Sequence, residues 1–313
     1  MQETRAEILA RLADGPVTGP ELADSLGVSR AAVWKQIESL REAGFEIPSG
    51  DAGYRLASVP EFGGAAIEFG LDAPYSIEYH DTITSTNDRA RELAVEGRTD
   101  AVVIADEQTG GRGRLDREWR SPSGGIWLSF LVRPEIPTVQ APIYTLAGAV
   151  ATTRAVRELG VDARIKWPND VQVGGRKLAG ILTEMEGEAD RISWLVVGIG
   201  LNANVDPGQL PAEQPVTSLQ SETGEVDRRT VTQSLLEEFR KLAAETDSIL
   251  PAWRELATTV GKRVRVETPD GEVVGDAVGI DSPGTLLVDT GGETVTVTAG
   301  DCEHLQPGDV SRD

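Results

Sequence analysis

A glycine- and arginine-rich stretch at residues 107–119, EQTGGRGRLDREW, limits the folds open to this chain more than any other feature. It lies between two segments with the composition of strands, residues 101–106 and 126–133. Glycines let the backbone approach a ligand closely, and arginines offer charged planar forks to carboxylate or phosphate oxygens. The residues concerned are Gly110, Gly111, Gly113, Arg112, Arg114 and Arg117. The pattern predicts an inter-strand loop that covers an anion, although a soluble hairpin or a segment attracted to nucleic acid has the same composition.

The charge of the chain is strongly negative. With 51 acidic against 30 basic residues its net charge is −21, and only five of the basic residues are lysines. Many surface carboxylates keep a protein soluble in concentrated salt, which screens their mutual repulsion. We therefore predict a halophile-like protein, with an ordinary acidic cytoplasmic protein as the alternative. At 313 residues the chain is long enough for two or three domains.

Signals for zinc, disulfides, secretion and membrane insertion are missing from the sequence. The single cysteine, Cys302, cannot form an internal disulfide, and with two histidines the chain lacks the ligands of a zinc site. Any metal is expected to be a hard cation held by oxygen. The first residues, MQETRAEILARLADG, are acidic where a signal peptide is basic and then apolar, and no apolar run approaches the ~18 residues of a membrane span. We expect a cytoplasmic protein without a membrane partner.

Residues 1–58 have the pattern of a winged helix-turn-helix domain. Helices are predicted at residues 4–12, 19–26 and 29–41, and short strands at residues 45–47 and 54–56. Gly27 is expected to end the second helix and Ser29 to cap the third. The third helix resembles a recognition helix.

Charge decides whether such a helix suits DNA. Residues 1–58 are net acidic, yet the third helix carries three basic residues against one acidic residue. The candidates to contact bases or phosphates of operator DNA are Ser29, Arg30, Lys35 and Gln36. The alternative is a helical domain that acts only as a structural or regulatory lid.

Two further domains are predicted after a linker at residues 59–73. Residues 74–259 alternate between strands and helices, as in an α/β domain, and residues 260–306 hold four short strands that predict a small β barrel. Strands of the first are expected at residues 76–81, 101–106, 126–133, 164–167, 171–173, 177–184 and 194–204, and helices at residues 90–95, 140–159 and 230–246 and around Trp253. Gly198 and Gly200 remove side chains from the last strand where a ligand or another backbone comes close.

Five short motifs follow one another in the central domain. They are TSTN at 84–87, Q-x₂-GRGR at 108–114 with Trp119 behind it, KWPND at 166–170, RKLAGI at 176–181 and GIGLN at 198–202. In this order and spacing they resemble the motifs of biotin protein ligases, and the flanking domains make the chain similar to bifunctional ligases that also repress biotin operons. The resemblance implies an α+β multidomain protein. It would have an N-terminal winged helix-turn-helix, a central mixed-sheet α/β catalytic domain of the class II aminoacyl-tRNA synthetase and biotin–lipoate ligase fold, and a C-terminal SH3-like β barrel.

The resemblance also implies a two-step reaction. Biotin and ATP, with Mg²⁺, would give biotinyl-5′-adenylate and pyrophosphate, and biotin would then pass to a lysine of a biotin carboxyl carrier protein or domain. The adenylate-bound form would dimerise and repress biotin genes. Whether dimerisation uses edge strands near residues 192–197 is left open by the sequence. Two alternatives also stay open: a regulator that senses biotin without transferring it, and a ligase of the same fold for lipoate or another acyl group.

The same resemblance gives roles to residues of the motifs. The biotin-binding set is Ser85, Thr86, Asn87, Gln108, Gly111, Arg112, Gly113, Arg114, Lys177, Gly180, Leu182, Gly198 and Gly200. The set for ATP and the adenylate is Arg114, Arg117, Trp119, Lys166, Lys177 and Asn202, and the catalytic set is Lys177, Arg112, Arg114, Asp170 and Lys166. Fixed positive charge suits this chemistry, because a carboxylate must approach the α-phosphate of ATP. Asp170 would hold Mg²⁺ or take the proton of the acceptor lysine, with a plain turn residue as the alternative.

One part of the loop departs from the pattern of the family. Where many relatives place glycine and further basic residues, residues 115–118 read Leu-Asp-Arg-Glu, so two carboxylates lie beside the anion site. Asp116 can still take a left-handed conformation, so the fold of the loop is expected to survive. We expect the weaker positive field to give low activity and a leaky adenylate in dilute buffer, both of which recover in molar KCl.

Overall fold

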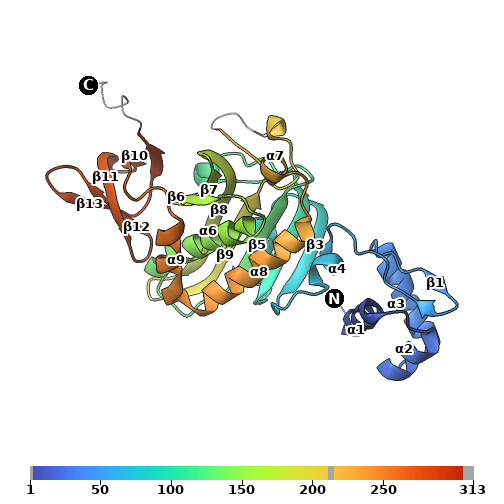
Figure 1. Ribbon diagram of the computed structural model, residues 1–313. Coiled ribbons are helices and arrows are strands. Elements are labelled where there is room, and N and C mark those ends of the chain that lie inside the picture. The colour runs from blue at the N-terminus through green and yellow to red at the C-terminus, as the bar shows by residue number, and fades with distance from the viewer. Residues whose placement is uncertain (1–2, 211–214, 306–313) are drawn as a thin grey trace.

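The computed structural model describes residues 3–210 and 215–305, which form three units in a row (Figure 1). The first unit contains α1 (Glu3–Asp14), α2 (Gly19–Leu26), α3 (Arg30–Glu42), β1 (Ser49–Gly50) and β2 (Gly53–Tyr54). Gly27 ends α2 with a φ of 64°, a left-handed conformation that suits glycine. Ser29 Oγ caps α3 by accepting a hydrogen bond from the amide of Ala32. The predicted helix-turn-helix is therefore confirmed.

The wing has less regular pairing than predicted. Its strands, β1 and β2, pair Ser49 with Tyr54 and Gly50 with Gly53, so they reach only the first residue of the second predicted strand. The first predicted strand, residues 45–47, contributes a single antiparallel bridge, in which the Glu46 amide donates to the Ser58 carbonyl at 3.1 Å and the Ala57 amide donates to the Glu46 carbonyl at 2.8 Å. Phe45 and Ile47, on either side of Glu46, are buried in the core of the three helices.

Seven strands form one mixed sheet in the central unit. They are β3 (Ser76–Ile83), β4 (Ala101–Gln108), β5 (Ile126–Val132), β6 (Arg164–Lys166), β7 (Asp170–Val173), β8 (Arg176–Glu188) and β9 (Arg191–Leu201). Their order is β3-β4-β5-β9-β8-β7-β6, with β3 and β4 parallel and the other neighbours antiparallel. β9 pairs with β8, but its register with β5 covers only residues 195–201, so within residues 192–197 only residues 195–197 are paired on both sides.

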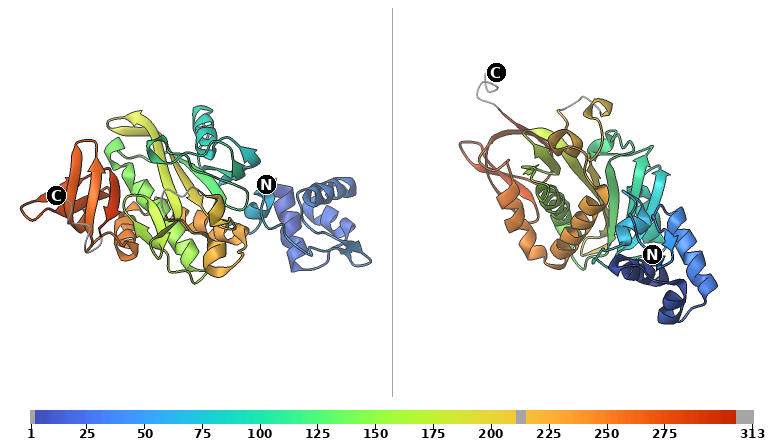
Figure 2. Two further views of the ribbon diagram at one scale, coloured as in Figure 1. Left: turned by 90° about the horizontal axis from the view of Figure 1, so that it is seen from above. Right: turned by 45° about the vertical axis from the view of Figure 1, so that its right-hand side comes forward.

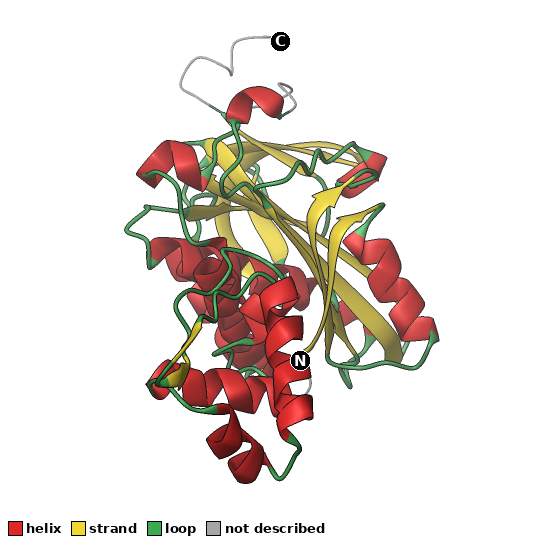
Figure 3. Ribbon diagram, turned by 90° about the vertical axis from the view of Figure 1, so that its right-hand side faces the viewer, coloured by secondary structure: helices red, strands yellow, loops and turns green. Residues whose placement is uncertain are grey.

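Helices cover the two faces of this sheet unequally (Figure 3). On one face pack α6 (Pro142–Arg157), α8 (Arg228–Ala244) and α9 (Ile249–Leu256), and on the other packs α5 (Thr86–Val95). Side chains of β4 alternate accordingly, since Val102 and Ile104 join the larger core whereas Val103 packs against α5. Complete burial of such a side chain contributes about 1.5–3 kcal/mol. The α5 face carries less helix and has room for a site.

A five-stranded antiparallel sheet forms the third unit, at the opposite end from the N-terminal domain (Figure 2). Its strands are β10 (Arg263–Thr268), β11 (Gly271–Asp281), β12 (Thr285–Asp289), β13 (Thr294–Val297) and β14 (Asp301–His304), in the order β13-β12-β11-β10-β14. The sequence does not predict β14, because its four residues contain a single apolar side chain, Cys302. The core of this sheet is continuous with the central core, whereas the N-terminal domain has a core of its own.

Short helices lie in two connections. They are α4 (Gly64–Glu68) in the linker and α7 (Leu219–Thr223) after β9. Within the described ranges, no helix is long and apolar enough to cross a membrane.

Candidate active site

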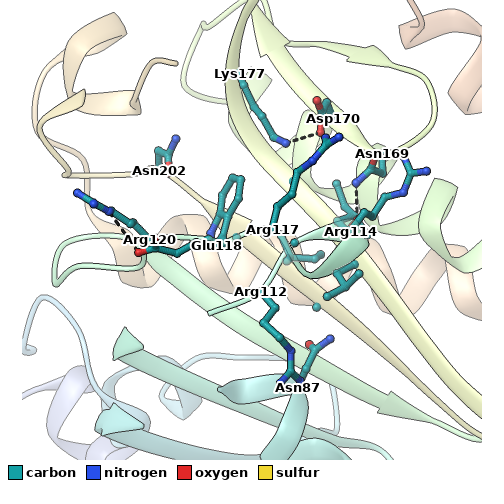
Figure 4. A pocket seen from close by; sticks show the side chains of 18 of the residues that line it. Asn87, Arg112, Arg114, Arg117, Glu118, Arg120, Asn169, Asp170, Lys177 and Asn202 are labelled. Carbon is teal, nitrogen blue, oxygen red and sulfur yellow. Dashed lines mark hydrogen bonds and ion pairs between the residues drawn. The ribbon is translucent and has the colours of Figure 1, made fainter. Parts of the chain in front are cut away.

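One cavity on the α5 face of the central sheet collects the predicted site residues (Figure 4). Its volume is about 490 Å³. All predicted biotin, ATP and catalytic residues line it, with the exception of Gly111. A Cβ at Gly111 would lie 2.4 Å from the carbonyl oxygen of Trp119, so this glycine lets the loop fold against itself behind the wall. The structure thus brings the five motifs together in one place.

The end of the cavity beside α5 is uncharged and held by hydrogen bonds. Gln108 Oε1 accepts from the Thr86 amide at 2.8 Å and from its hydroxyl at 3.0 Å, while Gln108 Nε2 donates to Ser121 Oγ at 2.8 Å. Ser129 Oγ lies 2.6 Å from Asn87 Oδ1 and 2.7 Å from Thr86 Oγ1. Each of these groups fixes the orientation of the next. We call Ser85, Thr86, Asn87 and Gln108, together with the buried Ser129 behind them, the neutral end.

Sequence reasoning misses two partners of Asn87. Ser129 is completely buried on β5, and Glu184 accepts a hydrogen bond of 2.6 Å from Asn87 Nδ2. The one polar side chain in the apolar strand IWLSFLV was the available signal for Ser129, because a buried hydroxyl needs a hydrogen-bond partner. Both residues orient Asn87, which the sequence does predict.

Two glycines of β9 make room for side chains of the cavity. A Cβ on Gly198 would lie 2.2 Å from Asn87 Oδ1, and one on Gly200 would lie 2.4 Å from Trp119 Nε1. Any larger residue would therefore displace these side chains. The close approach expected at both glycines is made by Asn87 and Trp119.

The other end of the cavity is lined by cations that face carboxylates (Figure 4). Lys177 Nζ lies 2.7 Å from Asp170 Oδ1, and both side chains are nearly buried. The same Nζ is 5.0 Å from the centre of the Trp119 ring, a cation–π contact. We call Arg114, Arg117, Lys166, Asp170 and Lys177 the charged end. Arg112 points toward Asn87, between the two ends, and its Nη2 is 2.5 Å from Asp88 Oδ1.

The C-terminal sheet holds two arginines of the charged end. Arg114 Nη2 donates to the Gly300 carbonyl at 3.0 Å, its Nη1 is 3.6 Å from Asp301 Oδ1, and Arg117 pairs with the same carboxylate. Asp301 and Cys302 also line the cavity, and no motif predicts them because the sequence does not predict β14. Burial raises the pKa of the Cys302 thiol to about 11, so this residue is not a thiolate nucleophile at neutral pH.

The turn of the KWPND motif also rests on the C-terminal unit. The Trp167 amide donates to Thr259 Oγ1 at 2.9 Å, and the Trp167 indole donates to the Gly284 carbonyl at 2.8 Å. Thr259 Oγ1 lies 3.0 Å from His304 Nε2. Burial, aided by the charge of Lys166, lowers the pKa of His304 to about 4, so the imidazole is neutral at neutral pH. A neutral ring can accept a hydrogen bond from the Thr259 hydroxyl.

The tip of the glycine–arginine loop contains a left-handed residue. Leu115 takes this conformation, with a φ of 55°, and the residue is 74% exposed. This conformation is uncommon for a residue with a side chain. That Asp116 can take it too stays a prediction.

Two buried polar atoms of the cavity lack a hydrogen-bond partner within the part of the chain that the structure describes. They are Trp119 Nε1 and Asn202 Oδ1. The oxygen of Asn202 is oriented by its amide nitrogen, which donates to the Thr217 carbonyl at 3.0 Å. An unpaired buried group costs about 1–3 kcal/mol. One donor and one acceptor left unpaired in a cavity suit a ligand such as a nucleoside, which offers both kinds of group.

The predicted DNA contacts lie on α3 in two different environments. Arg30 and Lys35 are exposed, and Trp34 between them is 58% exposed. Gln36 is half-buried, and its Oε1 accepts a hydrogen bond of 2.9 Å from Arg5 Nε on α1. Ser29 is the N-cap. The solvent face of α3 is therefore basic and partly aromatic, while the Gln36 side chain is already oriented by Arg5.

The fold and this cavity define the class of biotin and lipoate protein ligases. Residues 79–202 match the Biotin/lipoate A/B protein ligase family, residues 259–305 match the biotin protein ligase C-terminal domain, and residues 4–55 match an HTH domain. The structure is similar to the biotin protein ligase from Aquifex aeolicus in complex with biotin and ATP. The TM-score is 0.62 at 28% identity, over 73% of this chain and 97% of that chain.

Comparison with curated proteins gives a narrower assignment. The chain is 38% identical to the bifunctional ligase/repressor BirA of Bacillus subtilis, over 95% of this chain and 96% of that protein. It is 32% identical to the protein of the same name from Escherichia coli, over 91% and 92%. The chain therefore belongs to the family of bifunctional ligase/repressors. The predicted fold class is confirmed.

Proposed function

We propose that this protein is an ATP-dependent biotin protein ligase, which forms biotinyl-5′-adenylate and transfers biotin to a lysine of a biotin carboxyl carrier protein or domain. The proposal rests on one observation, which is that the neutral end and Lys177 lie at the same cavity. A buried ureido ring needs paired donors and acceptors, which the neutral end provides. A carboxylate beside the α-phosphate needs fixed positive charge, which Lys177 provides.

In the first step an oxygen of the biotin carboxylate bonds to the α-phosphorus, and pyrophosphate leaves. Lys177 would lie between the two anions, with Arg114 and Lys166 beside the phosphates. Trp119 and Asn202 would use their unpaired donor and acceptor on the adenosine part. Holding both substrates in one orientation lowers the barrier further.

Magnesium fits this site as a partner of the phosphates, whose charge it would neutralise. No group of three potential metal ligands gathers among the described residues. Mg²⁺ is commonly held by one or two carboxylates together with substrate phosphates. Asp170, in the cavity and 2.7 Å from Lys177, is the carboxylate placed to serve.

In the second step the amine of the acceptor lysine attacks the carbonyl carbon of the mixed anhydride, and AMP leaves. The amine must lose a proton, and Asp170, which lines the cavity beside Lys177, would take it. The loop at residues 107–119 covers this side of the cavity and would keep water from the adenylate.

The N-terminal domain supports a second activity, repression of biotin genes through operator DNA. Arg30 and Lys35 are exposed on α3, where a recognition helix meets the major groove. We place the protein in the cytoplasm, as a homodimer when the adenylate is bound.

Transfer of radiolabelled biotin to a purified carrier domain tests the ligase. The reaction contains ATP and Mg²⁺ in concentrated salt, with wild type, Lys177→Ala and Lys241→Ala compared. Lys241 is an exposed lysine paired with Glu238 at 2.9 Å and serves as the matched control. Transfer by the wild type and the control, with loss in Lys177→Ala, supports the proposal. Binding of biotin without adenylate formation or transfer would favour a regulator that only senses biotin. Labelling of the carrier by lipoate instead of biotin would favour a lipoate ligase of the same fold.

A further inference from the structure

Arg228 is a buried cation outside the cavity that the ligase chemistry does not use. It is the first residue of α8 and is 8% exposed. The N-terminus of a helix carries a partial positive charge, so a cation is disfavoured there. Contacts of its side chain must therefore stabilise the positive charge at this position.

One guanidinium joins three segments that are far apart in the sequence. Arg228 Nε and Nη2 donate to the two carboxylate oxygens of Glu61 at 2.8 and 2.7 Å. Its Nη1 donates to Asp106 Oδ1 at 2.6 Å and to the Gly125 carbonyl at 3.1 Å. The guanidinium also lies over the Phe62 ring, 4.2 Å from its centre. Both charged partners and the aromatic ring lie outside α8.

Two of these partners, Asp106 and Gly125, lie at the two stems of the glycine–arginine loop. Asp106 is on β4, two residues before its last residue Gln108, and Gly125 directly precedes β5. Burial alone would raise the pKa of the Asp106 carboxyl, but hydrogen bonds from Ser123 and Arg228 outweigh burial and lower it. The stems are therefore joined by an ionised carboxylate.

The remaining partners belong to the linker from the N-terminal domain. Glu61 and Phe62 precede α4, which lies beside β3 at the end of the central unit that faces the DNA-binding domain (Figure 1). The Phe62 ring also packs edge-on against Tyr79 of β3, with ring centres 5.8 Å apart. The linker is thus attached to the same guanidinium as the loop stems.

We propose that Arg228 is a positioning residue that fixes both stems of the loop at residues 107–119 and couples them to the linker. Closure of the loop over the adenylate and the placement of the DNA-binding domain then depend on one guanidinium. A buried cation that loses one of its carboxylates is left poorly compensated, so the loss of Glu61 loosens the stems as well. The inference rests on the proposed function, since it needs the adenylate as ligand.

The variant Glu61→Gln removes the linker carboxylate and leaves the Asp106 contact. Glu7→Gln is the matched control, because Glu7 is 48% exposed against 45% for Glu61 and pairs with one arginine, Arg11. We expect biotinyl-5′-adenylate to dissociate about tenfold faster from Glu61→Gln and at the wild-type rate from Glu7→Gln. The kcat of Glu61→Gln at saturating substrates is expected to stay at the wild-type value. Arg228→Lys, which keeps the charge but loses the fork, is expected to act in the same direction.

Hydrogen exchange of the linker, residues 59–73, tests the coupling directly. The adenylate is expected to slow exchange there in the wild type and in Glu7→Gln, but not in Glu61→Gln. A dissociation rate for Glu61→Gln within about twofold of wild type, or a linker that the adenylate leaves unchanged in the wild type, overturns the inference. A wild type that forms no adenylate contradicts the proposed function instead, so the two failures are distinguishable.

Discussion

The two ends of the cavity are built in opposite ways. At the neutral end, Thr86, Asn87 and Gln108 bond to one another or to buried partners such as Ser129, within the central sheet and α5. At the charged end, Arg114 and Lys177 face carboxylates, and one of these comes from the C-terminal unit. The neutral end is complete before a ligand arrives. At the charged end, phosphates must replace carboxylates as the partners of the cations.

Exposure explains why this exchange is easy for the pair of Arg117 and Asp301. The Arg117 side chain is 58% exposed and that of its partner Asp301 is 27% exposed. Ion pairs of this kind contribute about 0–1 kcal/mol, so a phosphate can displace the carboxylate at little cost. Rearranging the buried network around Asn87 would leave polar groups unpaired and cost more. Mutations and salt should therefore act differently at the two ends.

The largest effect is expected for Arg114→Gln, at the charged end. Loss of a placed cation should lower kcat/KM for ATP by about 10²–10³ in the adenylation step. The KM for biotin should stay unchanged, because the neutral end is intact. Arg120→Gln is the control, since Arg120 lines the same cavity but is 55% exposed and pairs with Glu118. Both variants are assayed by pyrophosphate release at varied ATP concentration. Equal losses of kcat/KM for ATP in the two variants would contradict a special role of Arg114 at the charged end.

The next effect is expected for Ser129→Ala, at the neutral end. Asn87 and Thr86 lose a buried partner, which costs about 1.5 kcal/mol and raises the KM for biotin about tenfold. The KM for ATP should not change. Thr153→Ala is the matched control, because Thr153 is equally buried on α6 and bonds only to the Ala149 carbonyl. A wild-type KM for biotin in Ser129→Ala would mean that Asn87 is oriented without Ser129.

Sequence patterns predict the parts of this molecule that depend on local signals. The helix-turn-helix follows from Gly27 and Ser29, and all seven strands of the central sheet follow from apolar runs and turns. The five motifs bring almost all predicted site residues to one cavity. Strand order is not local, which is why residues 192–197 could be considered as an edge although β9 is internal.

What the sequence misses depends on contacts between distant segments. Asp301 acquires its place from the packing of β14, a strand with one apolar residue, against the loop that carries Arg114. Ser129 matters because of Asn87, which lies in a different element. Leu115 of the loop takes a left-handed conformation, which an apolar residue with a side chain rarely adopts, so its local preference does not predict this turn.

Salt should change the KM for ATP more than the KM for biotin, but by a smaller factor than the two substitutions do. At about 50 mM KCl the net charge of −21 repels ATP, and the carboxylates of Glu118 and Asp301 line the cavity in which its phosphates would bind. Raising KCl to about 1 M screens this repulsion, so the KM for ATP should fall a few-fold and adenylate leakage should decrease. The KM for biotin should change less, because the neutral end carries no formal charge. Full activity with a tight adenylate in dilute buffer would refute this hypothesis.

The smallest effect concerns His304, which supports the wall of the charged end through Thr259. Its folded pKa of about 4 lies below the value of ~6.5 expected in the unfolded chain. Between these values the unfolded state binds more protons, so the free energy of unfolding falls as pH falls from 6.5 toward 4 and is insensitive to this group above 7. His304→Gln keeps an acceptor for Thr259 without the titration, so its melting temperature should fall less in acid than that of the wild type. Equal losses would mean that His304 charges in place, and that the C-terminal wall tolerates a cation where the structure places a neutral ring.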